Sequence, residues 1–146
     1  MSKYLLDTNV VIAADIATYV DHGTAITAVQ TLIAQGEQLY VCPQVCTEYW
    51  SLMTRPRPRG IGLSSVNAAK AVQDLRERLY GWLPDPPALF EKWLELCTAH
   101  DIRGAKVYDA RLASAAALHN IPTILTFNDK DFAAYPHLTA VNPASV

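Results

Sequence analysis

Short apolar runs alternate along the chain with longer segments whose apolar residues recur at helical spacing. The runs at 3–6, 38–42 and 121–126 are typical of buried β-strands, and 140–141 can add an edge strand. The intervening periodicity predicts helices over 10–20, 24–35, 43–54, 65–80, 86–100 and 107–119. Strands that alternate with helices predict an α/β fold with a mostly parallel central sheet covered on both faces.

Local signals agree with several of these limits. Pro43 fits the first turn of the helix that it opens, and Ser64 or Ser65 can cap the fourth helix. Ligands of parallel sheets bind at the carboxyl ends of the strands. Asp7 and the segment 128–131 follow strands, so both are expected where a ligand would bind.

Composition describes a folded chain rather than a disordered one. The 146 residues are 51% apolar and 18% charged, with a net charge of -2, which suits a single domain over 1–146 without a general affinity for nucleic acid. No apolar run approaches the roughly 20 residues that span a bilayer, and no leader-like segment follows Met1. Cys42, Cys46 and Cys97 match no zinc or disulfide pattern, so we expect reduced thiols and a cytoplasmic protein.

Charge is unevenly spread along the chain. Residues 1–50 hold five acids against one base, whereas 51–111 hold ten bases against seven acids. An acidic site beside a basic surface suits an enzyme with a polyanionic substrate, although ordinary variation of surface charge explains the same pattern.

Three arginines, Arg55, Arg57 and Arg59, stand between the prolines and glycines of segment 55–62, which we call the arginine loop. The loop cannot form regular structure. Its arginines can grip RNA phosphates, or the loop can be a solvated connection between two helices.

Several carboxylates lie next to apolar residues that are predicted to be part of the hydrophobic core. Asp7 follows the first strand, Glu48 shares a helix face with Val45, and Asp109 shares one with Leu112. Desolvated carboxylates repel one another unless a cation or a shared proton intervenes. Mg²⁺ or Mn²⁺, held by oxygen ligands, can activate water and clamp a phosphodiester. The pattern therefore indicates a metal-dependent enzyme acting on phosphate esters.

Four segments taken in order resemble the PIN-domain ribonucleases, and among them the VapC-type toxins of bacterial toxin–antitoxin pairs. They are Leu5-Leu6-Asp7-Thr8-Asn9, Thr47-Glu48, Tyr108-Asp109-Ala110 and Ile124 to Phe132. The resemblance implies a three-layer α/β/α sandwich and Mg²⁺-dependent endonucleolytic cleavage of RNA, with Mn²⁺ as a possible substitute. It also implies a homodimer and a small antitoxin protein as partner.

The resemblance also implies roles for individual residues. Asp7, Glu48, Asp109 and a fourth acid would be both catalytic and metal-binding. Residues that orient or support them would be Thr8, Asn9, Thr126, Asn128 and Asp129. Some family members carry an aspartate two residues after the threonine, where this chain has Asn128; Asp129 and Asp131 are both close enough to substitute, and Asn128 can itself serve as an oxygen ligand or orient the others. We favour Asp131, because its Asp-Phe pair matches the family's ending.

Two other functions compete with this one. An aspartate-nucleophile phosphatase would use an aspartate at the end of its first strand, but it usually needs a second one two residues later, where this chain has Asn9. A catalytically silent PIN-like module would bind RNA or a protein, but it has no reason to bear the desolvation cost of buried acids.

Overall fold

A computed structural model of the chain describes residues 1–78 and 80–146. A five-stranded sheet with the order β3-β2-β1-β4-β5 lies at its centre, and every neighbouring pair of these strands is parallel. The strands are β1 (Lys3–Leu6), β2 (Gln38–Val41), β3 (Gly81–Trp82), β4 (Thr123–Leu125) and β5 (Thr139–Val141). The expected parallel sheet is confirmed.

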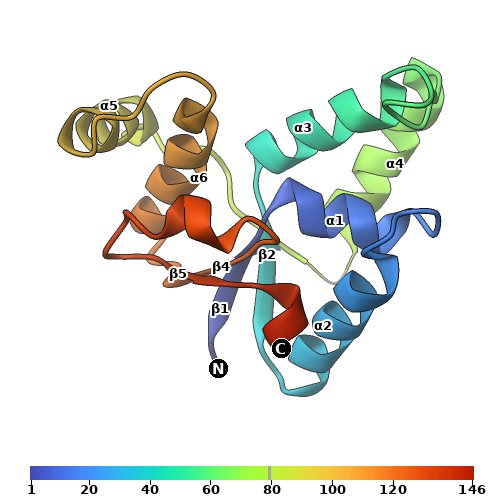
Figure 1. Cartoon of the computed structure of the whole chain (residues 1–146), viewed down its shortest axis with the longest axis horizontal. Coiled ribbons are helices and arrows are strands. Elements are labelled where there is room, and N and C mark those ends of the chain that lie inside the picture. The colour runs from blue at the N-terminus through green and yellow to red at the C-terminus, as the bar shows by residue number, and fades with distance from the viewer. Residues whose placement is uncertain (79) are drawn as a thin grey trace.

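Helices cover both faces of this sheet. They are α1 (Thr8–Asp15), α2 (His22–Ala34), α3 (Pro43–Thr54), α4 (Ser65–Glu77), α5 (Leu89–Ala99) and α6 (Lys106–Leu118), with short 3₁₀ helices η1 (Asp129–Phe132) and η2 (Pro143–Ser145). Figure 1 shows α5 and α6 on one side of the sheet and α1 to α4 on the other. The α/β/α arrangement is therefore confirmed as well.

The chain reverses its direction of travel across the sheet between β1 and β4. It runs outward from β1 to β3 and then returns to β4 and β5. Leu5 of β1 lies opposite Tyr40 of β2 on one side and Ile124 of β4 on the other. The Asp7 amide donates to the Leu125 carbonyl at 3.0 Å, so the carboxyl ends of β1 and β4 adjoin. Ligands of open parallel sheets bind at such a reversal.

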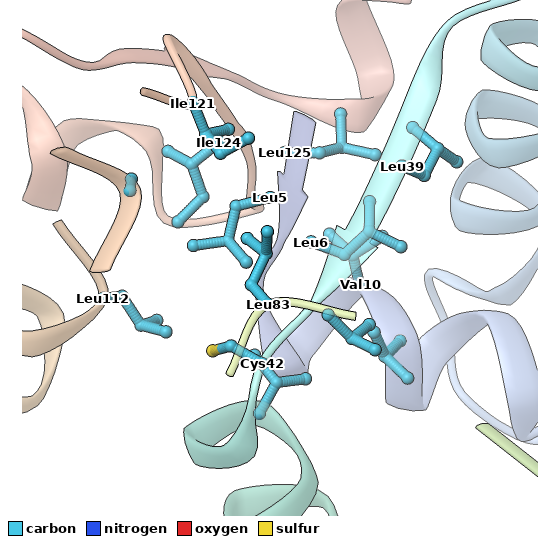
Figure 2. Close-up of a cluster of buried hydrophobic side chains, with 14 of the residues drawn as sticks. Leu5, Leu6, Val10, Leu39, Cys42, Leu83, Leu112, Ile121, Ile124 and Leu125 are labelled. Carbon is cyan, nitrogen blue, oxygen red and sulfur yellow. The ribbon is translucent and has the colours of Figure 1, made fainter. Parts of the chain in front are cut away.

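The core is centred on β1 and β4. Leu5, Leu6, Ile124 and Leu125 are each 0% exposed, and Figure 2 shows them packed between Leu112 of α6 and residues of the opposite layer. A parallel strand covered on both faces is expected to be apolar throughout. Each such side chain contributes about 1.5–3 kcal/mol by its burial, so the point from which Asp7 projects is rigid.

Helix α3 has the limits that the sequence predicts, but α1 does not. Helix α1 begins at Thr8 instead of residue 10, because the Asp7 side chain accepts from the Thr8 amide as its N-cap. The same helix ends at Asp15 instead of continuing to residue 20. The backbone becomes extended at Ile16, and no glycine or proline marks this end.

The second half of the chain departs from expectation at three points. Helix α4 ends at Glu77, three residues before the expected Tyr80, and residue 79 lies outside the described residues. Strand β3 is too short for its pattern to appear in the sequence. Helix α5 begins at Leu89, after the two prolines that were expected to open it.

In the described part of the chain no helix is both long and apolar enough to cross a membrane. Cys42, Cys46 and Cys97 are all free thiols, and the first two are buried. Burial raises the pKa of the Cys42 thiol to about 11, which makes it unreactive near neutral pH.

Candidate active site

Asp7 sits at the reversal of the sheet, immediately after β1. Its Oδ1 accepts from the Thr8 amide at 2.7 Å, and its Oδ2 accepts from the Thr126 hydroxyl at 2.8 Å. The residue is only 7% exposed. Burial raises the pKa of the Asp7 carboxyl and the nearby Asp131 charge adds to this, whereas the bonds from Thr126 and Thr8 lower it. Ionised Asp7 is therefore costly to bury, and it projects from a rigid part of the sheet.

Asn9 and Thr126 join the ends of β1 and β4 around this acid. The Asn9 amide donates to the Thr126 hydroxyl oxygen at 3.3 Å, and its own oxygen accepts from the Phe127 amide at 3.2 Å. The Asn128 backbone amide also donates to the Thr126 oxygen, at 3.0 Å. Thr126 is fully buried, so its hydroxyl positions Asp7 and is not free for a ligand.

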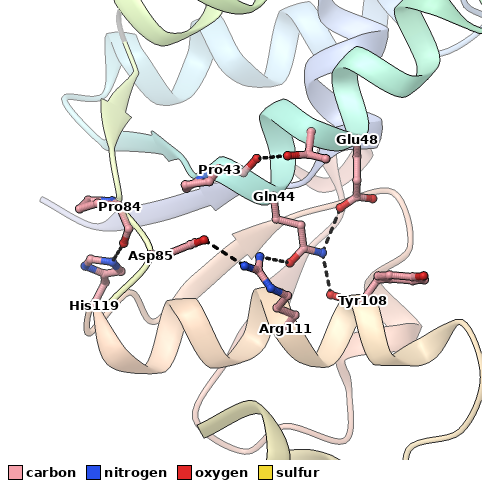
Figure 3. Close-up of polar contacts among 9 residues, drawn as sticks. Pro43, Gln44, Glu48, Pro84, Asp85, Tyr108, Arg111 and His119 are labelled. Carbon is pink, nitrogen blue, oxygen red and sulfur yellow. Dashed lines mark hydrogen bonds and ion pairs between the residues drawn. The ribbon is translucent and has the colours of Figure 1, made fainter. Parts of the chain in front are cut away.

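Glu48 approaches the same region from α3. It is half-buried, and its Oε1 accepts from the Gln44 side-chain amide at 3.0 Å (Figure 3). Burial raises the pKa of the Glu48 carboxyl, and the Asp7 charge raises it further. The Gln44 hydrogen bond and the Arg111 charge act in the opposite direction.

Asp109 lies in the first turn of α6, one position before the buried Ala110. Burial is the largest cause of its perturbed pKa, and the charges of Asp7, Asp131 and Glu48 follow in that order. Together they raise the pKa of the Asp109 carboxyl to about 6. The structure therefore brings carboxylates from separate elements within electrostatic reach of one another.

The three candidates for the fourth acidic position differ in their surroundings. Asn128 lines the same cleft as Asp7, whereas Asp129 accepts from the Asn142 side chain at 3.1 Å beyond β5. Asp131 is exposed on η1, and its charge raises the pKa of both Asp7 and Asp109. Asp131 does not line the cleft itself, but of the two aspartates it is the one whose charge reaches Asp7 and Asp109.

A cleft of about 430 Å³ opens over these residues. Its lining includes Asp7, Thr8, Asn9, Glu48, Asp109 and Asn128. Asp21 and Tyr19, from the connection between α1 and α2, also line it, and the sequence analysis missed both. Their only sequence signal is an acid and an aromatic residue beside the second helix, which does not reveal that the connection lines the same cleft as Asp7.

The arginine loop lines a second cavity, of about 620 Å³. Arg57 and Arg59 lie in its wall together with Tyr19, which also lines the acidic cleft. Arg57 Nε donates to the Ile61 carbonyl at 3.1 Å, and Arg55 donates to the Ser51 hydroxyl from outside this cavity. Two of the three arginines therefore share a cavity that borders the acidic cleft.

The donor set of the cleft fits a hard cation. All candidate ligands are oxygens, and the Thr8 hydroxyl oxygen is buried beside Asp7 with no hydrogen-bond partner among the described residues. Within 1–78 and 80–146, no three Asp, Glu, His or Cys side chains are close enough to hold one ion between them. Mg²⁺ commonly keeps several waters and takes only one or two carboxylates directly, so this spacing is compatible with it.

The model of the PIN domain family matches residues 4–138. The chain belongs to the PIN domain family. No curated protein sequence matches it.

Several solved structures are similar to this PIN domain. Mycobacterium tuberculosis VapC20, a toxin that cleaves the sarcin–ricin loop, is 24% identical, with a TM-score of 0.68 over 91% of this chain and 95% of its own. The VapBC2 structure from Rickettsia felis gives 19% identity and a TM-score of 0.70 over 96% and 98% of the chains. VapBC-1 from nontypeable Haemophilus influenzae gives 17% and 0.70 over 97% and 98%. These likenesses show a shared fold over nearly the whole length.

Proposed function

We propose that this chain, a single PIN domain, is a metal-dependent endoribonuclease that serves as the toxin of a type II toxin–antitoxin pair. One observation carries the proposal. Asp7, Glu48 and Asp109 come from β1–α1, α3 and α6, yet they line one cleft at the carboxyl ends of the strands. Burial, followed by the charges of Asp7, Asp131 and Glu48, raises the pKa of Asp109, so gathering ionised acids in this cleft costs folding free energy that a purely structural role does not explain.

In this proposal Asp7, Glu48, Asp109 and Asp131 are the catalytic acids and would hold Mg²⁺, with Mn²⁺ as an alternative, one or two of them directly and the others through water. Held by these residues, such an ion would supply a lower pKa for bound water and neutralisation of charge on the phosphodiester. Asn128 supplies a further oxygen, and Asp129 shapes the segment through Asn142.

The neighbours of Asp7 provide preorganisation. Thr126 and the Thr8 amide each hold one of its oxygens, and Asn9 braces Thr126. Because these bonds come from rigid strand ends, the carboxylate does not need to reorganise when substrate binds.

RNA is the proposed substrate, and it would run from the acidic cleft across Tyr19 to the arginine loop. Tyr19 borders both cavities, so an unpaired base can stack on its ring. Arg57 and Arg59 then lie where phosphates beside the cleaved bond would pass, with Arg55 at the outer end.

The proposed partners are a cognate antitoxin and a second copy of the chain, in the cytoplasm. Support for the antitoxin is the fold shared with chains of VapBC complexes. Support for the homodimer is the apolar surface of α5, where Phe90 is 62% and Leu94 is 49% exposed.

The test is cleavage of total bacterial RNA by the purified protein in Mg²⁺ or Mn²⁺. Asp7→Asn keeps the shape of the side chain and should abolish cleavage, whereas Asp74→Asn, at an exposed aspartate of α4, should not. Wild-type protein that binds RNA without cutting it would favour the catalytically silent module. Release of inorganic phosphate from small phosphate esters would favour a phosphatase.

A further inference from the structure

Gln44 is a buried glutamine that joins Glu48 to α6. It is only 7% exposed, and its Nε2 donates to both Glu48 Oε1 at 3.0 Å and the Tyr108 carbonyl at 2.8 Å. Its Oε1 accepts from Arg111 Nη1 at 3.1 Å, and Arg111 Nη2 in turn donates to Asp85 at 2.9 Å. Figure 3 shows this chain of contacts from Glu48 through the amide to the guanidinium.

The surroundings of Gln44 determine which way its amide points. Its NH₂ faces two acceptors, a carboxylate and a carbonyl, while its oxygen faces a guanidinium, which can only donate. A flipped amide would set oxygen against both acceptors and NH₂ against Arg111. The orientation is therefore held from both sides.

One amide group keeps the cation of Arg111 apart from the carboxylate of Glu48. Among the described residues Arg111 donates to Gln44 and Asp85, and Glu48 accepts from Gln44, so the two charged groups do not touch. Arginine usually grips a carboxylate through two parallel hydrogen bonds, which would occupy both oxygens. Glu48 instead keeps Oε2 without a hydrogen bond from the described residues, and it lines the acidic cleft.

We propose that Gln44 is a positioning residue that keeps Glu48 oriented and free of an ion pair, by standing between it and Arg111. This inference rests on the proposed function, because it assigns Gln44 a role through Glu48. The bond to the Tyr108 carbonyl adds a second effect. Because Tyr108 immediately precedes Asp109, this hydrogen bond connects Glu48 of α3 to the backbone beside Asp109 of α6 through one buried side chain.

Gln44→Met keeps the length of the side chain and removes its polar end, and it leaves Arg111 free to pair with Glu48. We expect Gln44→Met to weaken Mn²⁺ binding and to lower kcat on RNA by about tenfold to a hundredfold, the usual cost of losing a residue that supports a metal ligand. KM for RNA should hardly change. Gln73→Met, at an exposed glutamine of α4, is the matched control.

The double variant Gln44→Met/Arg111→Met separates positioning from mere packing. If Arg111 captures Glu48 in the single variant, removing Arg111 should restore most of the lost Mn²⁺ affinity and kcat. Mn²⁺ affinity is measured by thermal shift of the protein without RNA, and kcat by single-turnover cleavage. Gln44→Asn, too short to span both partners, replaces Gln44→Met if the latter does not fold.

Two results would overturn the inference: a single variant with wild-type Mn²⁺ affinity, or a double variant no better than the single one. Wild-type protein that binds Mn²⁺ but does not cut RNA would overturn the nuclease proposal alone, because the Mn²⁺ titration still decides on Gln44. Wild-type protein that neither binds Mn²⁺ nor cuts RNA would overturn both.

Discussion

Asp109→Asn should stabilise the metal-free protein at neutral and alkaline pH. The pKa of Asp109 is raised from 3.8 to about 6, so the folded chain binds more protons than the unfolded chain between these values. Stability therefore falls as pH rises through that window, and the full cost is present above it. Asparagine keeps the shape and removes the charge.

The size of the effect follows from the shift. Each pKa unit corresponds to about 1.4 kcal/mol, so a rise from 3.8 to about 6 sets an upper limit of about 3 kcal/mol. Asp109 is only half-buried, and solvent screening reduces this to about 1 kcal/mol. For a chain of 146 residues this corresponds to a Tm about 3 °C higher in the variant.

The measurement is thermal unfolding in EDTA across a pH series, with Asp74→Asn as the exposed control. At about pH 8 Asp109→Asn should melt above wild type, and at about pH 3, below the unfolded-state pKa of 3.8, the difference should nearly vanish, because Asp109 is then largely protonated in both states. Saturating Mn²⁺ should reverse the order at the higher pH. A variant less stable than wild type in EDTA at both pH values would refute the repulsion argument.

Three further results are expected. Mn²⁺ and Mg²⁺ should each raise the Tm of wild-type protein and EDTA should reverse this, whereas stabilisation by Zn²⁺ alone would contradict the oxygen-ligand site. Replacing all three arginines of the arginine loop with alanine should raise KM for RNA and make RNA binding less dependent on salt concentration. The control Lys92→Ala on α5 should change neither quantity. An unchanged salt dependence in the triple variant would mean that the loop only connects two helices. Thr126→Val should cost about 2–3 kcal/mol in unfolding experiments, because the buried hydroxyl that bonds charged Asp7 is lost, and Thr126→Ser should cost less since it keeps that hydroxyl.

The sequence by itself determined the parts of this protein that local pattern controls. Apolar runs predicted β1, β2 and β4, because a parallel strand buried on both faces must be apolar along its length. Pro43 placed the start of α3 correctly, and the position of Asp7 after the first strand placed it at the carboxyl edge. That Glu48 and Asp109 do not face open solvent also followed from helical spacing.

Only the tertiary structure decided which side chains meet. Asp21 and Tyr19 line the cleft from the connection that follows the early end of α1, and no residue pattern predicts that end. In the sequence Gln44 is indistinguishable from an ordinary helical glutamine. In the structure α6 places the Tyr108 carbonyl and Arg111 within hydrogen-bond distance of its side chain. Such contacts join residues far apart in the chain, and their free energy depends on burial and on distances that packing alone sets. The spacing of residues in the sequence therefore identified the acids Asp7, Glu48 and Asp109. Only the packing of the elements showed which groups position them.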